Sequence, residues 1–170
     1  MGYKQGIKGA IIRAEDGAII PQDPQNVDYQ AYLAWVESGN TAAPLPSETL
    51  AQVVAAQIAS ISAACEAAIV SGFTSSALGS VHTYPSTETD QRNLLGSAFA
   101  AQGRDSGWAS PLWCTTDAGQ WAFLPHSAAQ VQQVNADWVD FRDVLRRKYA
   151  NLIDQVNAAT SISEVGGITW

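Results

Sequence analysis

Two long stretches of the chain place apolar side chains at steps of three and four residues, the spacing that gives an α-helix one apolar face. The longer stretch follows Ser127 and continues to about Ala158. Its apolar positions are Val131, Val134, Trp138, Phe141, Leu145 and Leu152. The other stretch lies between Ser47, a good helix N-cap, and Gly72. Its apolar positions are Leu50, Val54, Ile58, Ile61, Cys65 and Ile69.

The two predicted helices suit each other as partners. The helix after Ser47 is rich in alanine and serine, and such small side chains let a neighbouring helix approach closely. We therefore expect an antiparallel helical hairpin within one chain, with Trp138 and Phe141 packed against the small residues. A trimer built on the same stripe is the alternative. The stripe breaks at Lys148 after little more than two heptads, which favours pairing within the chain.

A shorter helix is predicted between the two long ones, over residues 87–102. Thr87 and Asp90 fit a capping box, in which each side chain bonds the other residue's backbone N–H. The same pattern occurs at the start of the long C-terminal helix and of a last short turn, as Ser127 with Gln130 and Ser161 with Glu164. The side chains expected to face inward from the shorter helix are Leu94, Leu95, Ala98 and Phe99.

A β-hairpin is predicted over residues 111–125, ahead of the long C-terminal helix. Its turn falls at residues 117–119, and Trp113 and Trp121 stand nearly opposite each other. The simplest interpretation puts this tryptophan pair in the core, with Trp138 on its helix stripe. Tryptophan also anchors protein interfaces, so an interface is the competing interpretation for the six tryptophans of the chain.

The first forty residues contain a second predicted hairpin and a short helix. Apolar runs at residues 10–12 and 18–20 flank Asp16-Gly17, a strong turn dipeptide. The helix is expected over residues 28–40, with Asp28 as its cap and Tyr32, Trp35 and Val36 at helical spacing. The stretch "TAAPLP" that follows is typical of a linker. We therefore place a domain boundary between residues 43 and 44.

Together these elements predict an α+β fold. Residues 44–170 would form a core domain of two long antiparallel helices, a shorter helix and short β-hairpins. Residues 1–43 would form a small appendage of one hairpin and one helix. No strand–helix–strand rhythm indicates a parallel sheet.

Charge and composition narrow the function. The 170-residue chain has a net charge of −7 and a pI near 4.6, which argues against nucleic-acid binding. No run of 18 apolar residues is present, so we expect no membrane insertion. Cys65 falls on an apolar helix face, where a free thiol packs as a small hydrophobic group, so a disulfide with Cys114 is not expected.

The most polar stretch of the chain is "VHTYPSTETDQRNLLG", residues 81–96. It lacks a complete catalytic or phosphate-binding motif: GxSxG and SxxK are absent, and no Gly-Lys-Ser follows its single glycine. A metal site would need His82, His126, Cys114 and Asp117 to meet, and no short ligand spacing supports this. With capping chemistry at Thr87 and Asp90, the stretch is better interpreted as a structural junction, and we predict no cofactor and no metal.

Two longer segments resemble known proteins. Residues 11–41, "IIRAEDGAIIPQDPQNVDYQAYLAWVESGNT", resemble the opening of many small tailed-phage tail proteins, which share the pattern "DGA-IP-D--N-DY--YL-W---GNT" before a proline linker. Residues 50–170 resemble a phage domain family of uncharacterised function in tail-fibre and fibre-assembly proteins. The matching residues are His82, Tyr84, Asp90, Gln91 and Asn93, then "WCTTDAGQW", "HSAAQVQQV" and "ATSISEVGGITW".

The resemblance implies a virion or assembly role without catalysis. It implies tail-fibre or baseplate proteins as partners, a homotrimer as a possible state, and a location in the virion tail after synthesis in the host cytoplasm. It also gives the polar junction a meaning: Asp90 caps a helix, Gln91 and Asn93 bind the neighbouring hairpin, and His82 meets His126. The candidate interface residues are Tyr29, Tyr32, Trp35 and Trp170.

Three functions remain open on this basis. The first is a structural component of the tail, bound at the fibre or baseplate. The second is a fibre-assembly chaperone that leaves before the virion is complete. The third, a distant one, is an enzyme of the tail tip.

Overall fold

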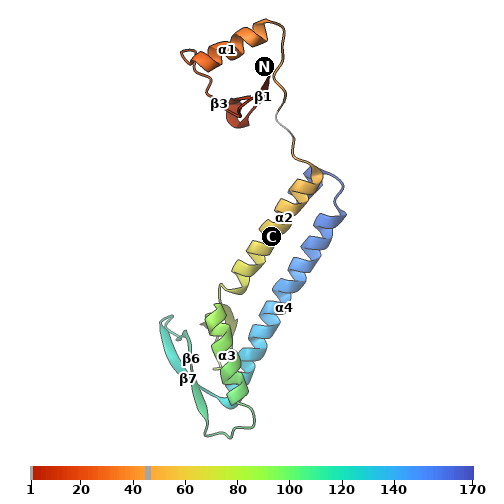
Figure 1. Ribbon diagram of the computed structural model, residues 1–170. Helices are drawn as coiled ribbons and strands as arrows, with labels where there is room; N and C mark the ends of the chain where they lie inside the picture. The colour runs from red at the N-terminus through yellow and green to blue at the C-terminus, as the bar shows by residue number, and fades with distance from the viewer. Residues whose placement is uncertain (1, 45–46) are drawn as a thin grey trace. The chain divides into compact units, whose positions relative to one another are not determined.

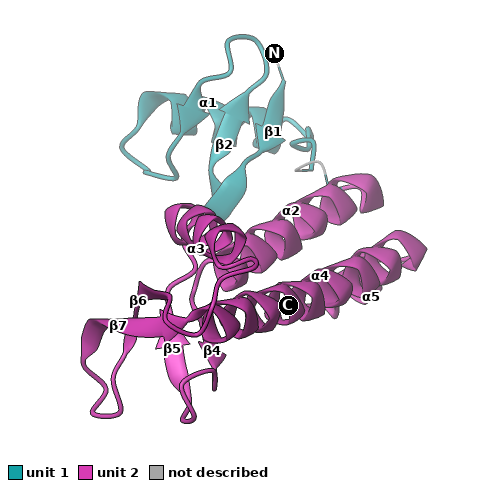
Figure 2. Ribbon diagram, turned by 90° about the horizontal axis from the view of Figure 1, so that it is seen from below, with its two compact units in different colours: residues 1–48 teal, residues 49–170 magenta. Residues whose placement is uncertain are grey.

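A computed structural model describes residues 2–44 and 47–170. The chain divides into two compact units, Met1–Glu48 and Thr49–Trp170, coloured separately in Figure 2. The boundary lies a few residues after the predicted one. The centre of the predicted proline linker, residues 45 and 46, lies outside the described residues. The α+β class predicted from the sequence is confirmed.

The N-terminal unit is a three-stranded antiparallel sheet with one helix. Its strands lie in the order β1-β2-β3, with Tyr3 opposite Arg13 and Ile11 opposite Ile20. The predicted hairpin is β2–β3, and β1 was not predicted. The elements are β1 (Tyr3–Gln5), the short 3-10 helix η1 (Ile7–Gly9), β2 (Ile11–Arg13), β3 (Ile19–Ile20) and α1 (Val27–Glu37).

The cap of α1 differs from the expectation. Asn26, not Asp28, caps the helix, because its side chain accepts a hydrogen bond from the Tyr29 N–H over 3.0 Å. Asp28 instead forms an ion pair with Arg13 of β2, at 2.7 Å between Nη1 and Oδ1. A carboxylate is favourable both as the N-cap and in the first helical turn, because both lie near the positive end of the helix. The sequence alone therefore did not show which of these two positions Asp28 occupies.

The C-terminal unit is built on α2 (Leu50–Ile69) and α4 (Ala128–Ala158), which pack side by side and antiparallel (Figure 1). This is the intrachain helical hairpin expected from the two apolar stripes. One end of the pair carries two short hairpins and α3, which is labelled in Figure 1, and α5 packs at the other end. The remaining elements are β4 (Phe73–Ser75), β5 (His82–Tyr84), α3 (Glu88–Ala100), β6 (Ala109–Thr115), β7 (Trp121–Ser127) and α5 (Ile162–Gly166).

Capping boxes begin four helices of this unit. Those predicted at Thr87, Ser127 and Ser161 are confirmed. For α2 the predicted cap, Ser47, is wrong: Thr49 caps the helix, with Gln52 as its reciprocal partner. The sequence offered both hydroxyls, and only Thr49 has the glutamine three residues later that completes the box.

The apolar core of this unit lies in separate clusters along the helical pair. Ile61 of α2 meets Val156 and Val165 at the α5 end, and all three are buried. The head end, where α3 and the hairpins gather, has a cluster of Phe73, Tyr84, Leu94, Cys114, Val134 and Trp138. A smaller cluster of Ala98, Ala101 and Val131 joins α3 to the first turn of α4.

Trp138 packs on a different partner from the one expected. The thiol of Cys65 lies 3.9 Å from the Leu145 carbonyl oxygen, which places these two residues level across the helical pair. Trp138 lies about two turns further toward the start of α4, where α2 has already ended at Ile69. Its ring therefore packs on Phe73 of β4, with ring centres 5.4 Å apart, rather than on the small residues of α2.

α2 has an unusual composition for a helix of a small unit. Among the described residues it is the one helix whose length and mean hydropathy, 20 residues and 1.4, would suit a membrane span. Only 11 % of that apolar window is buried, although Ile61 and Cys65 direct one face onto α4. Helices of soluble proteins can have this length and composition too, so the expectation of no membrane insertion stays a prediction.

Several side chains predicted to face inward are exposed. On α3, Leu94 and Ala98 are buried, whereas Leu95 and Phe99 are 64 % and 75 % exposed. On the β6–β7 hairpin the strand register sets Trp113 opposite Phe123, and Trp121 opposite Thr115. Trp113 and Trp121 are each more than 40 % exposed, so the interpretation of this pair as core is wrong.

We predict that Trp138→Ala destabilises the C-terminal unit by about 3–5 kcal/mol, because it empties the centre of the head cluster. Urea unfolding followed by circular dichroism measures the change. Phe123→Ala, which removes an exposed ring from the same region, is the matched control and should cost under about 1 kcal/mol.

We also predict that the melting temperature of the unmutated protein does not change on dilution, because the α2–α4 seam is closed within one chain. A melting temperature that falls on tenfold dilution would show that chains share the seam.

Candidate functional site

His126 and Tyr84 form a buried hydrogen-bonded pair beneath the β6–β7 hairpin. The Tyr84 hydroxyl lies 2.8 Å from His126 Nε2, and His126 Nδ1 lies 2.8 Å from the Leu124 carbonyl oxygen. The carbonyl can only accept, so Nδ1 carries the proton and Nε2 accepts from the tyrosine. Burial lowers the pKa of His126 and raises that of Tyr84, which keeps both groups neutral.

The expected contact between His82 and His126 is replaced by separate partners. His82 Nδ1 faces the Thr115 carbonyl oxygen of β6, and its Nε2 lies 2.9 Å from Ser80 Oγ. Ser80 in turn donates to Asp117 Oδ1 over 2.6 Å, in the turn of the β6–β7 hairpin. Ser80 carries no signal in the sequence beyond its place two residues before His82.

Ser80, His82 and Asp117 are the residue types of a hydrolytic triad, but their order is different. In a triad the carboxylate orients the histidine and the histidine activates the serine. Here the Asp117 carboxylate accepts from the serine hydroxyl and lies 3.6 Å from His82 Nε2, while the Thr115 carbonyl oxygen faces the other ring nitrogen, Nδ1. The arrangement ties the loop between β4 and β5 to the β6–β7 turn, which is a structural role.

The start of α3 is also a structural junction. Asp90 Oδ2 accepts from the Thr87 backbone N–H at 3.1 Å, as a cap does. Gln91 does not reach the hairpin: its amide donates to the Ser86 carbonyl oxygen at 2.8 Å. Ser86 is buried and bonds both the Gly72 N–H and the Ile69 carbonyl oxygen, so it joins the end of α2 to the start of α3.

Asn93 behaves differently from its neighbours. It is exposed, and its amide has no hydrogen-bond partner among residues 2–44 and 47–170, so the expected bond to the hairpin is absent. The same holds for the hydroxyls of Ser97, one turn further along α3, and Ser110 of β6. These three side chains line one cavity.

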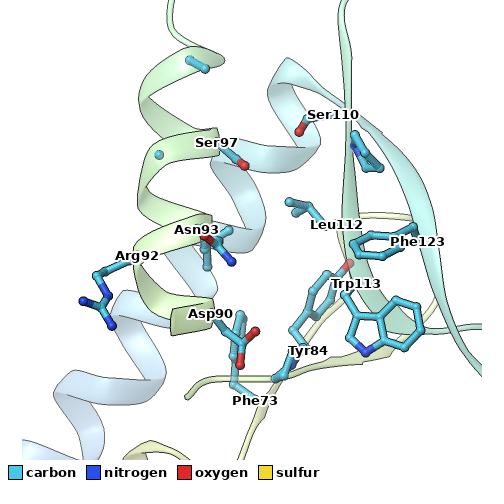
Figure 3. A pocket seen from close by; sticks show the side chains of 15 residues that line it. Phe73, Tyr84, Asp90, Arg92, Asn93, Ser97, Ser110, Leu112, Trp113 and Phe123 are labelled. Atoms are coloured by element: carbon cyan, nitrogen blue, oxygen red, sulfur yellow. The ribbon is translucent and has the colours of Figure 1, made fainter. Parts of the chain in front are cut away.

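This cavity lies between α3 and the β6–β7 hairpin and has a volume of about 510 Å³ (Figure 3). Asp90, Asn93 and Ser97 lie along one side of α3, and Trp113 and Phe123 lie on the opposite wall (Figure 3). Leu94, Leu112, Phe73 and Tyr84 supply apolar surface between them. An apolar pocket of this size with a few polar groups is the usual form of a ligand site.

The outer face of the hairpin continues the aromatic wall. Successive residues of a strand point to opposite faces, so one face carries Leu112, Cys114, Leu124 and His126 toward the core. The other face carries Pro111, Trp113, Trp121, Phe123 and Pro125. The Trp113 ring lies 4.8 Å from Phe123 and 6.3 Å from Trp121, centre to centre, so the three rings form one exposed surface. We call this surface the aromatic face.

The other candidate interface residues take part in packing. Tyr29, Tyr32 and Trp35 are partly buried against the core of the N-terminal unit, and Trp35 lies 5.0 Å from the Tyr3 ring. Trp170 packs against the α5-end cluster, with Lys148 Nζ 4.3 Å from its ring centre. Part of the surface of each of these aromatic side chains is buried within its own unit, and only the remainder is open to a partner protein.

Metal ligation and thiol reactivity depend on how histidine, cysteine and acidic side chains are grouped and buried. The described part of the chain contains no group of three or more histidine, cysteine or acidic side chains placed to hold a metal ion. Cys65 and Cys114 are both free and buried, and burial raises the pKa of each thiol. Both therefore stay protonated near neutral pH and act as packing groups.

We predict that His126 makes the protein less stable in mild acid. Its folded pKa lies below the ordinary 6.5, so its contribution is complete above pH 6.5 and is lost as pH falls toward the folded value. The free energy of unfolding, measured by urea titration between about pH 7.5 and about pH 5, should fall less for His126→Gln than for the unmutated protein. His82 is present in both proteins, so equal slopes would contradict the assignment to His126.

The comparisons with known proteins concern most of the C-terminal unit. Neither the curated proteins nor the solved structures contain a significant match to the chain. Residues 51–168, from the first turn of α2 to just beyond α5, match a family described as "Domain of unknown function (DUF4376)". The match covers well over half of the chain, and the protein therefore belongs to the DUF4376 family.

Proposed function

We propose that this protein is a structural component of a bacteriophage tail, bound at the tail fibre or baseplate through protein–protein contacts. The observation that carries the proposal is the division into two units, each with its own apolar core. One unit serves to dock, and the other presents a binding surface. The resemblance of residues 11–41 to the opening segment of tail proteins supports the N-terminal unit as the docking unit.

The residues that carry this resemblance are those that fold the N-terminal unit. Asp16 and Gly17 form the β2–β3 turn, where hydrogen bonds from Arg13 and Ala18 hold the pKa of Asp16 at about 2. Asn26 caps α1, and Tyr32 and Trp35 pack on the core. The residues common to residues 11–41 and the tail proteins are thus the ones that fold the N-terminal unit. A small unit that folds by itself can be joined to different proteins, and this suits attachment to a tail component that those proteins have in common.

The family match supports the same division. It begins at residue 51 and leaves the N-terminal unit outside. The C-terminal unit would thus carry the family's own role, and the aromatic face gives it a surface of the kind that marks an interaction site.

A fibre-assembly chaperone is the second candidate. The observation that favours it is the composition of α2: only 11 % of its apolar window lies buried, and its exposed positions are mostly alanines. A chaperone needs an apolar surface of this kind to hold a fibre segment until it assembles. An enzyme of the tail tip has less support, since the Ser80–His82–Asp117 cluster has the geometry of a structural tie.

We predict that residues 49–170 fold without the N-terminal unit, because their core clusters involve none of residues 1–48. The truncated protein should keep the helical circular dichroism and the melting temperature of its unit, yet fail to enter virions when it replaces the full chain. Trp35→Ala in the full chain is the second variant, because it damages only the docking unit. An unfolded truncation, or one that still enters virions, would contradict the docking role.

Quantitative mass spectrometry of purified virions separates the two candidates. A tail component is expected at a fixed copy number per particle. Presence in infected cells together with absence from virions would favour the chaperone.

A further inference from the structure

The cavity between α3 and the β6–β7 hairpin has the chemistry of a carbohydrate site. A pyranose ring presents C–H groups on its faces and hydroxyls around its rim. It is bound by an aromatic ring that covers a face and by short polar side chains that meet the hydroxyls. The cavity places these two kinds of group on opposite walls (Figure 3).

The polar wall is supplied by α3, and Ser110 of β6 adds a hydroxyl on the hairpin side of the cavity (Figure 3). Asp90 uses Oδ2 for the helix cap, while Oδ1 has no partner among the residues that the structure describes. The Asn93 amide, one turn along the helix, and the hydroxyls of Ser97 and Ser110 are likewise unpaired there. Amides and hydroxyls both donate and accept, which matches sugar hydroxyls, since these do the same.

The aromatic wall is supplied by Trp113 and Phe123. Their ring centres are 4.8 Å apart, and both side chains are substantially exposed, so their surface is open to a ligand. Both rings lie on one side of the cavity. The other two aromatic side chains, Phe73 and Tyr84, are 3 % exposed and offer little surface.

This arrangement argues against a cation and against a phosphate as the ligand. An aromatic cage for a cation needs exposed rings on several sides, and here they stand on one wall. A phosphate site needs positive charge directed inward, whereas the Arg92 guanidinium donates to the Glu88 carbonyl oxygen and points away from the aromatic wall (Figure 3). Asp90 would repel the phosphate. A neutral ligand rich in hydroxyls fits both walls.

We propose that the cavity binds a neutral oligosaccharide, with one sugar ring against Trp113 and its hydroxyls bonded to Asp90, Asn93 and Ser97. The volume of the cavity allows for more than one sugar unit. This site is separate from the docking role of the N-terminal unit and does not depend on the tail assignment.

The test is ligand-observed saturation-transfer NMR and calorimetry on the full chain. The neutral probes are maltotriose, cellotriose and triacetylchitotriose, followed by an array of neutral glycans. Trigalacturonate and choline are the acidic and cationic probes. We expect a neutral saccharide to bind with a Kd on the order of 1 mM or tighter, which is typical of an open site with few anchors.

Three variants test the placement of the ligand. Trp113→Ala and Asn93→Ala should each weaken binding at least about tenfold, equivalent to about 1.4 kcal/mol. Trp121→Ala is the matched control: it removes the same side chain type from the same face at similar exposure, but outside the cavity. It should change Kd by less than about twofold. Because Asn93 is exposed and unpaired, its variant keeps the test valid if Trp113→Ala does not fold.

Three results would overturn the proposal. One is the absence of binding to every neutral glycan on the array. Another is binding restricted to trigalacturonate or choline, which would assign the cavity to a charged ligand. The third is an equal loss for Trp121→Ala and Trp113→Ala, which would indicate adhesion to the aromatic face rather than binding in the cavity.

Discussion

The C-terminal unit depends on a mismatch in length between its two paired helices. α2 has 20 residues and α4 has 31, so the start of α4 extends past the end of α2. Val131, Val134 and Trp138 lie on this extension and need cover from other elements. The chain supplies α3 and two short hairpins, which pack against α4 where α2 is missing. The cavity, the buried histidines and the aromatic face all belong to this cover.

A two-stranded hairpin covers a core with one face only, and this explains the chemistry of the head. The inner face of β6–β7 buries His126 and Cys114, so their polar atoms must find partners inside the protein. The His126–Tyr84 pair meets that need, and no buried side-chain nitrogen or oxygen in the described residues lacks a hydrogen bond. The outer face carries no buried polar atoms that need partners. Packing within the chain does not explain why its aromatic rings are exposed.

The residues that bind a ligand or partner are therefore expected among the side chains that do not hold the fold together. Asp90, Gln91 and His82 looked chemically interesting in the sequence, and each has a bonding role that the fold needs, as cap, junction or tie. Asn93, Ser97 and Trp113 have no such role, and together with Asp90, whose Oδ1 is not used by the cap, they line one cavity. The proposed tail role rests on the division of the chain, and the proposed carbohydrate site rests on these unoccupied groups.

Features that depend on neighbours within about one helical turn could be predicted from the amino-acid sequence. The capping boxes at Thr87, Ser127 and Ser161, the long apolar stripes and the β2–β3 and β6–β7 turns were predicted because their hydrogen bonds and periodicities are local. Asp90 and Asn93 were among the residues that the resemblance to the phage domain family pointed out. Tertiary packing determines which face each short element buries. Both faces of β6–β7 are apolar, and α3 carries the adjacent pairs Leu94-Leu95 and Ala98-Phe99, so pattern could not choose. It likewise placed Ser80 beside Asp117 and Ser110 across from Asn93, because those contacts join segments that lie far apart in the chain.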